Sequence, residues 1–153
     1  MTDHRTEMIM AEDRGWNELC DLVERLDPHR LDQPGYSDEW SVKDLLGHLA
    51  AWWAEAAHAL ERIRMGTYTS EKLDIDGMNR RFFEAFRDTD ADTVRAELWA
   101  SRNRALEELW RLPEITKDAD EWFMESGAEH YQEHLPELRR FVEEAKARGA
   151  SAG

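Results

Sequence analysis

The sequence predicts an all-α protein, a four-helix bundle with crossover connections and one extra short helix. Its 153 residues contain four long stretches in which apolar residues recur at three- and four-residue steps, the spacing of amphipathic helices. Capping residues, prolines or glycines mark the ends of these stretches. The connecting segments show no alternation of apolar and polar residues that would indicate a strand. Packing four apolar faces together is the simplest way to bury them.

The first predicted helix runs from about Thr6 to Leu26 and carries a stripe of apolar side chains. Asp27-Pro28 ends it, because proline lacks the amide hydrogen that a helix interior needs. The next segment, 29–39, holds the turn pair Pro34-Gly35 and is predicted to be a loop. This loop is longer than a tight hairpin requires, so it allows a crossover connection.

The second predicted helix begins after Ser41 and stops at Gly66. Ser41 and Asp44 form a variant of the capping box, which satisfies the free amide groups of the first turn. His48 lies about two turns inside this helix. The short extra helix follows, from about Ile75 to Arg87.

A third long helix is predicted over Val94 to Trp110, after the run 88–92, which is rich in capping residues. Pro113 follows this helix. Residues 114–125 are mixed and polar, apart from the apolar anchor Trp122-Phe123, and they predict a connection rather than another long helix.

The last predicted helix begins at Ser126 with a full capping box, completed by Glu129, and ends at about Ala147. Residues 149–153 are predicted to be a disordered tail. Residues 1–148 then form a single domain, because a chain of this length builds one hydrophobic core and nothing in its composition indicates a second.

The chain is strongly acidic, with 20 Lys+Arg, 34 Asp+Glu and a formal net charge of -14. Such a surface repels phosphate backbones and anionic lipids, so neither a nucleic-acid partner nor a membrane is expected. Cys20 is the only cysteine in the sequence, which excludes an intrachain disulfide and a cysteine-rich zinc site. With no signal-peptide pattern near Met1, these features predict a cytoplasmic protein.

Three histidines are the candidate functional residues. His130 and His134 are four residues apart, so they share one helix face with about 5–6 Å between their Cβ atoms. Two imidazoles at this separation can reach one metal ion, and His48 on another helix would supply a third nitrogen. Three nitrogen donors with open positions are typical of a catalytic metal site. The spacing alone also fits hydrogen-bonded histidines in the core.

Two motifs resemble the DinB-like superfamily. The first runs from Trp40 to Leu49 and continues to Trp52-Trp53, and the second runs from His130 to Leu138. The chain is most similar to the mycothiol-dependent maleylpyruvate isomerase N-terminal domains and to the ClbS/DfsB family. This resemblance spans nearly the whole chain and implies a four-helix bundle.

The resemblance also implies a metal site, with His48, His130 and His134 holding a divalent ion, often zinc or nickel. It implies a small-molecule substrate and a low-molecular-weight thiol of the mycothiol or bacillithiol type. Metal coordination lowers the pKa of such a thiol or of water, which then attacks an electrophilic substrate. Transfer, isomerisation and hydrolysis are the expected reaction classes.

Two other functions fit the sequence. A metal-independent hydrolase or sequestering protein of the ClbS/DfsB type would protect the cell from a reactive small molecule, with the histidines in acid–base or hydrogen-bonding roles. A non-catalytic homodimeric bundle would bury a remaining apolar helix face between two copies. Homodimerisation is expected for the enzyme as well.

Further residues are candidates for binding the substrate or the thiol. Trp52, Asn79 and Tyr131 are predicted to contact the substrate, with packing or an exposed helix surface as the alternative. Four arginines would hold carboxylates of a thiol cofactor: Arg80, Arg81, Arg102 and Arg104.

Overall fold

The computed structural model describes residues 3–37 and 39–152 and has no strand among them, only an isolated bridge between Pro34 and Ser41. The predicted all-α class is confirmed. The helices of the described residues are α1 (His4–Glu24), η1 (a 3₁₀ turn, Pro28–Arg30), α2 (Val42–Met65), α3 (Ile75–Phe86), α4 (Ala91–Arg111), α5 (Lys117–Ser126) and α6 (Ala128–Ala152).

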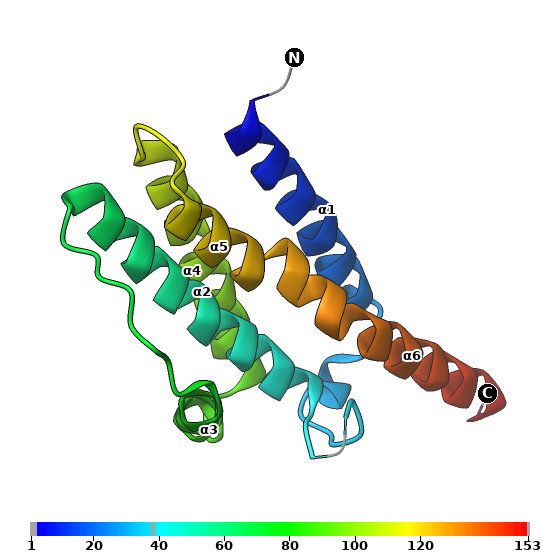
Figure 1. The fold of residues 1–153 in the computed structure, drawn as a ribbon. Coiled ribbons are helices and arrows are strands. Elements are labelled where there is room, and N and C mark those ends of the chain that lie inside the picture. The colour runs from blue at the N-terminus through cyan, green and yellow to red at the C-terminus, as the bar shows by residue number, and fades with distance from the viewer. Residues whose placement is uncertain (1–2, 38, 153) are drawn as a thin grey trace.

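The four long helices α1, α2, α4 and α6 form the bundle (Figure 1). Helix α2 packs most extensively against α4, and α1 packs against α6. After α2 the chain returns along the length of that helix to reach α3 (Figure 1). As a result α2 and α4 run in one direction, whereas α1, α5 and α6 run in the other. The predicted bundle with a crossover connection is confirmed.

The ends of α2 follow the predicted capping chemistry. The Ser41 hydroxyl accepts a hydrogen bond from the amide of Asp44, and the Asp44 carboxylate accepts one from the amide of Ser41 at 2.9 Å. Gly66 ends the helix in the left-handed conformation at φ 74°, which glycine adopts without strain. These two ends fix the position of His48 inside α2.

Helix α3 lies close against α2 because Gly47 has no side chain. A Cβ atom at Gly47 would lie 3.2 Å from the Phe86 side chain. Lys43 closes the end of α3, since its Nζ donates to the carbonyl oxygens of Arg87 and Thr89 at 2.8 Å each. This attachment holds α3, and with it Asn79, beside the middle of α2.

Helix α5 was not expected, because residues 117–126 are acidic and mixed. Thr116 starts it, and its hydroxyl accepts from the amide of Ala119 at 3.2 Å. Ser126 is therefore the last residue of α5, and the predicted capping box at Ser126 is wrong. Gly127 separates α5 from α6. A Cβ atom at Gly127 would lie 2.9 Å from the Trp53 ring, so a side chain does not fit there without a shift.

Helix α6 is longer than predicted. It continues to Ala152 rather than ending at about Ala147, so residues 149–152 of the predicted disordered tail are helical. Residue 153 lies outside the described residues. Residues 148–152 include Arg148 and two alanines, which are strong helix formers, together with Gly149, which is not.

One contiguous apolar core joins the helices. Its largest fully buried side chains include Trp53, Tyr36, Tyr131 and Phe123. Within 3–37 and 39–152, no helix has both the length and the apolar character that crossing a bilayer requires. The cytoplasmic location and the homodimer stay predictions.

Candidate metal centre

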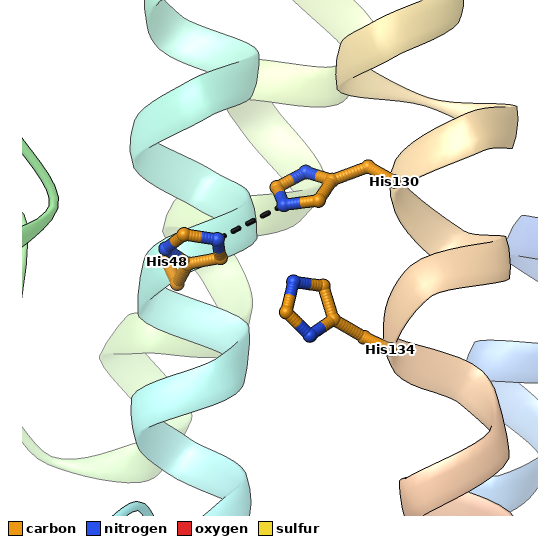
Figure 2. A group of neighbouring side chains, drawn as sticks. All are labelled: His48, His130 and His134. Atoms are coloured by element: carbon orange, nitrogen blue, oxygen red, sulfur yellow. Dashed lines mark hydrogen bonds between the residues drawn. The ribbon is translucent and has the colours of Figure 1, made fainter. Parts of the chain in front are cut away.

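Three histidine side chains meet between α2 and α6 (Figure 2). His48 comes from α2, and His130 and His134 come from consecutive turns of α6. Their ring centroids are separated by 4.8 to 5.2 Å. One ring nitrogen can be taken from each so that all three lie within 4.8 Å of one another. The structure thus brings together all three histidines that the sequence singled out.

Burial keeps these imidazoles neutral near neutral pH. The side chains of His48 and His130 are only 9% and 8% exposed. Burial and the neighbouring His134 lower the pKa of His48 to about 4. Burial, His48 and His134 lower the pKa of His130 to about 3, against a small opposing effect of the Ser126 backbone. Burial also lowers the pKa of His134, which Glu133 and Glu137 oppose. Neutral imidazole is the form that binds a metal ion.

The hydrogen bonds within the cluster are incomplete. Nε2 of His48 lies 2.9 Å from Nε2 of His130. A hydrogen bond between these two nitrogens requires that one of them carries a proton and the other does not. Nδ1 of both residues and Nε2 of His134 are buried without a hydrogen-bond partner among residues 3–37 and 39–152. Buried polar atoms are rarely left unpaired. Three neutral nitrogen donors at this separation fit a divalent ion such as zinc, so the residues present match the group that the resemblance implies.

Two aromatic residues before α2 hold the cluster. The Tyr36 hydroxyl contacts Nδ1 of His134 and is almost fully buried. The ring centroid of Trp40 lies 5.0 Å from that of His48 and 6.5 Å from that of His134. The planes of the Trp40 and His134 rings are close to parallel, with an angle of 24° between them. Both residues follow a turn and belong to no helical stripe, so no periodic pattern in the sequence pointed to their role.

A cavity of about 510 Å³ opens beside the histidines. Its walls come from α2, α3, α5, α6 and the segments before and after α2. The lining side chains, besides the three histidines, are Trp40, Trp52, Tyr68, Glu71, Leu73, Ile75, Asn79, Glu121, Trp122, Glu125, Ser126 and Glu133. This is enough space for a small organic molecule.

Two of the three predicted substrate contacts line this cavity. Nε1 of Trp52 donates to Oδ1 of Asn79 at 2.8 Å, which fixes both side chains on one wall. Trp122 lines the cavity too, and its Nε1 donates to the Tyr68 hydroxyl at 2.9 Å. The role of Trp122 depends on α5, which the sequence did not predict.

Tyr131, the third predicted substrate contact, does not line the cavity and is buried in the core instead. It follows His130 directly, and neighbouring helix residues point about 100° apart, which directs it into the core. Its hydroxyl donates to Glu12 at 2.8 Å and accepts from Nε1 of Trp53 at 3.1 Å. Tyr131 therefore anchors α6 in the bundle.

The predicted arginine cluster is not at the cavity either. Arg102 binds the fully buried Glu12 through two hydrogen bonds of 2.8 and 2.7 Å. Arg104 pairs with Glu61 at 2.7 Å. Arg80 and Arg81 are exposed and do not line the cavity.

Comparisons with known proteins agree with this architecture. The family model of the mycothiol maleylpyruvate isomerase N-terminal domain matches residues 13–130. That match contains His48 and His130 and ends before His134. No curated protein matches the sequence.

Two solved structures have the same fold. An uncharacterised protein from Escherichia coli UTI89 is 16% identical, with a TM-score of 0.78 over 93% of this chain and 94% of that one. The colibactin self-resistance protein ClbS, in complex with double-stranded DNA, is 17% identical. Its TM-score is 0.75, over 89% of this chain and 93% of that one.

The ClbS complex overturns the prediction that nucleic acid is excluded as a partner. That prediction depended on the net charge of -14. A protein of this fold binds double-stranded DNA in its crystal structure. Net charge sums over the whole surface and does not describe a local site, so the exclusion was wrong.

The sequence match and the fold lead to the same assignment. The family model covers well over half of the chain, and both solved structures share the helical-bundle architecture along almost its full length. The chain belongs to the mycothiol maleylpyruvate isomerase N-terminal domain family and has its DinB-like fold.

Proposed function

We propose that this protein is a metal-dependent enzyme in which His48, His130 and His134 hold one divalent ion, zinc or nickel. The supporting observation is the cluster of three neutral, buried imidazoles beside a cavity, with ring nitrogens that lack hydrogen-bond partners. Three protein ligands leave coordination positions open, as in catalytic rather than structural zinc sites.

The chemistry follows from the position of the site. A divalent ion held there supplies Lewis acidity, which lowers the pKa of a thiol or of water next to it. Family membership supports a low-molecular-weight thiol of the mycothiol type as the co-substrate and a small electrophile as the substrate. The reaction is then a thiol transfer, an isomerisation or a hydrolysis.

The residues around the histidines bind and orient the substrate. Trp52 and Asn79 are locked together by their hydrogen bond and provide a rigid wall beside His48. Trp40, which lines the same cavity, packs its ring against His48 and His134 and limits the access of water to them. A rigid wall favours the reaction because it holds the reacting groups in one geometry.

Metal analysis of protein purified without an affinity tag tests the proposal. We expect close to one zinc or nickel ion per chain, and loss of the ion in H48A, H130A and H134A. The exposed His58 on the same helix as His48 provides the control, because H58A should retain the ion. Protein that arrives metal-free and takes up neither zinc nor nickel would contradict the proposal.

Chelation separates this function from a metal-independent hydrolase of the ClbS/DfsB type. Turnover of an electrophile by the metal-dependent enzyme should disappear with exhaustive chelation and return with zinc or nickel. Turnover that persists in chelator would support the hydrolase instead.

A further inference from the structure

The cavity beside the histidines is lined by negative charge. Among the described residues that line it, four are glutamates and none is lysine or arginine. Glu121 pairs with Lys117 at 3.8 Å, whereas no ion pair of the described residues involves Glu71, Glu125 or Glu133. Burial, together with Glu129 and Glu121, raises the pKa of Glu125. The negative charge in this cavity is therefore largely unbalanced.

The cavity also lacks the arginine partners that several carboxylates have elsewhere in the described part of the bundle. On the other faces of the bundle, arginines neutralise carboxylates in close pairs: Arg102 with Glu12, Arg64 with Glu108, Arg104 with Glu61 and Arg139 with Glu18. No arginine or lysine is among the described residues that line the cavity, so its carboxylates have no cation of this kind beside them in the lining.

Two tryptophans of the cavity wall offer π surface, because their indole N–H groups are already bonded to other side chains. The indole N–H of Trp52 is bound to Asn79, and that of Trp122 is bound to Tyr68. His48 and His130, which also line the cavity, are about nine-tenths buried. Their neutral rings add nitrogen atoms that have no hydrogen-bond partner among the described residues. Carboxylates, aromatic faces and lone pairs all attract a cation.

We propose that this cavity selects a positively charged ligand, an amine or a quaternary ammonium group held between the carboxylates and the tryptophan rings. The inference rests on the proposed function, because it assigns a charge to the small molecule that binds in the same cavity. Anionic substrates, and thiols that carry several carboxylates, are repelled by the same lining.

Three molecules of the same shape and different charge test the selection. Choline is the cation, 3,3-dimethylbutan-1-ol is its neutral isostere, and 3,3-dimethylbutanoate is a matched anion. The quaternary nitrogen of choline has no lone pair, so it cannot bind a metal ion. Binding is measured in chelator-treated, metal-free protein by calorimetry and by the indole N–H resonances in NMR spectra. We expect choline to bind at least about tenfold more tightly than the alcohol, and the anion not to bind.

Paired variants assign the effect to the cavity. The double variant E71Q/E125Q replaces two exposed lining carboxylates, so its fold should be intact, and choline should bind about three- to tenfold more weakly. The matched control is E107Q, an exposed glutamate on α4 away from the cavity, which should change nothing. The alcohol should bind all these proteins equally.

Several outcomes would overturn the inference: equal affinity for choline and the alcohol, tighter binding of the anion, no detectable binding of choline, or equal weakening by E107Q and the double variant. Because the measurement uses metal-free protein, its result is independent of the metal analysis. Zinc uptake without ammonium selection would remove only this inference, and ammonium selection without metal uptake would remove only the proposed function.

Discussion

The hydroxyl group of Tyr36 bridges two atoms of His134. It donates a hydrogen bond to the carbonyl oxygen of His134 at 3.2 Å, and it lies 3.4 Å from Nδ1 of the same residue. A phenol has one proton, so the hydroxyl accepts at Nδ1, which places the imidazole proton there. Burial, with Glu137 and Glu133, raises the pKa of Tyr36 and keeps the phenol protonated. The lone pair of His134 is therefore on Nε2, the buried atom without a partner.

Removing this hydroxyl should weaken metal binding. We expect Y36F to lower the affinity for zinc about 10- to 100-fold, because groups that orient a metal-binding histidine have effects of this size. A competition titration with a chromophoric chelator measures the affinity. Y68F is the control, because Tyr68 binds Trp122 on the cavity wall and does not contact a histidine. Equal zinc affinities for Y36F and the unmodified protein would contradict the role given to Tyr36.

The buried ion pair of Glu12 and Arg102 should be important for stability. Glu12 is 0% exposed, so R102M leaves its carboxylate buried and unpaired. We expect the free energy of unfolding to fall by about 3–5 kcal/mol, measured by urea titration. R104M breaks the more exposed pair with Glu61 and should cost at most about 1 kcal/mol. Similar losses of stability in R102M and R104M would show that burial does not make the Glu12–Arg102 pair more important than the exposed pair.

Gly15 on α1 should not tolerate a side chain. A Cβ atom there would overlap Cδ2 of Tyr131, whose ring is held by Glu12 and Trp53 and cannot turn away freely. We expect G15A to lower the free energy of unfolding by about 1–3 kcal/mol, although alanine favours helices. At Gly149 on α6 an added Cβ atom meets no described atom within 4 Å, so G149A should be neutral or stabilising. Thermal unfolding compares the two variants, and a neutral G15A would contradict the packing argument.

The stability of the metal-free protein should fall in mild acid. The pKa values of His48 and His130 are lowered from 6.5 to about 4 and about 3. Between pH 6.5 and about 4 the unfolded chain therefore binds protons that the folded chain does not. The free energy of unfolding should fall on acidification by about 1.4 kcal/mol per pH unit for each such histidine. Above pH 6.5 these groups should add no pH dependence.

Urea titrations at several pH values measure this slope. H48Q should reduce the slope of the free energy of unfolding against pH by about 1.4 kcal/mol per pH unit, the contribution of one proton. H29Q, at an exposed position on η1, should leave the slope unchanged. A flat profile between pH 6.5 and 4 would show that the folded protein protonates the cluster as readily as the unfolded chain does.

The sequence located the histidines because helical periodicity carries directional information. A spacing of four places His130 and His134 on one face, and the capping box at Ser41 fixes the position of His48 in α2. The same periodicity also accounts for the placement of Tyr131. Its position beside the histidines suggested a role in the cavity, but one residue along a helix turns the side chain toward Glu12.

The acidic and aromatic lining was harder to predict because much of it comes from non-periodic segments. Tyr68 and Glu71 lie in the connection between α2 and α3, where no repeat shows which side chains face inward. Helix α5 escaped detection because its buried side is formed by Ala119, Phe123 and Ser126, a weak apolar stripe. Its contribution to the site could be recognised only from the packing of α5 against α2.

The histidine cluster joins distant parts of the chain, since His48 and His130 are 82 residues apart. A growing polypeptide that has already formed α2 still lacks two of the three nitrogens until α6 is synthesised. Capture of the proposed ion is therefore expected late in biogenesis, after the bundle has closed. Partly made chains would offer only one of the three imidazoles of the cluster and would compete poorly for scarce metal in the cell.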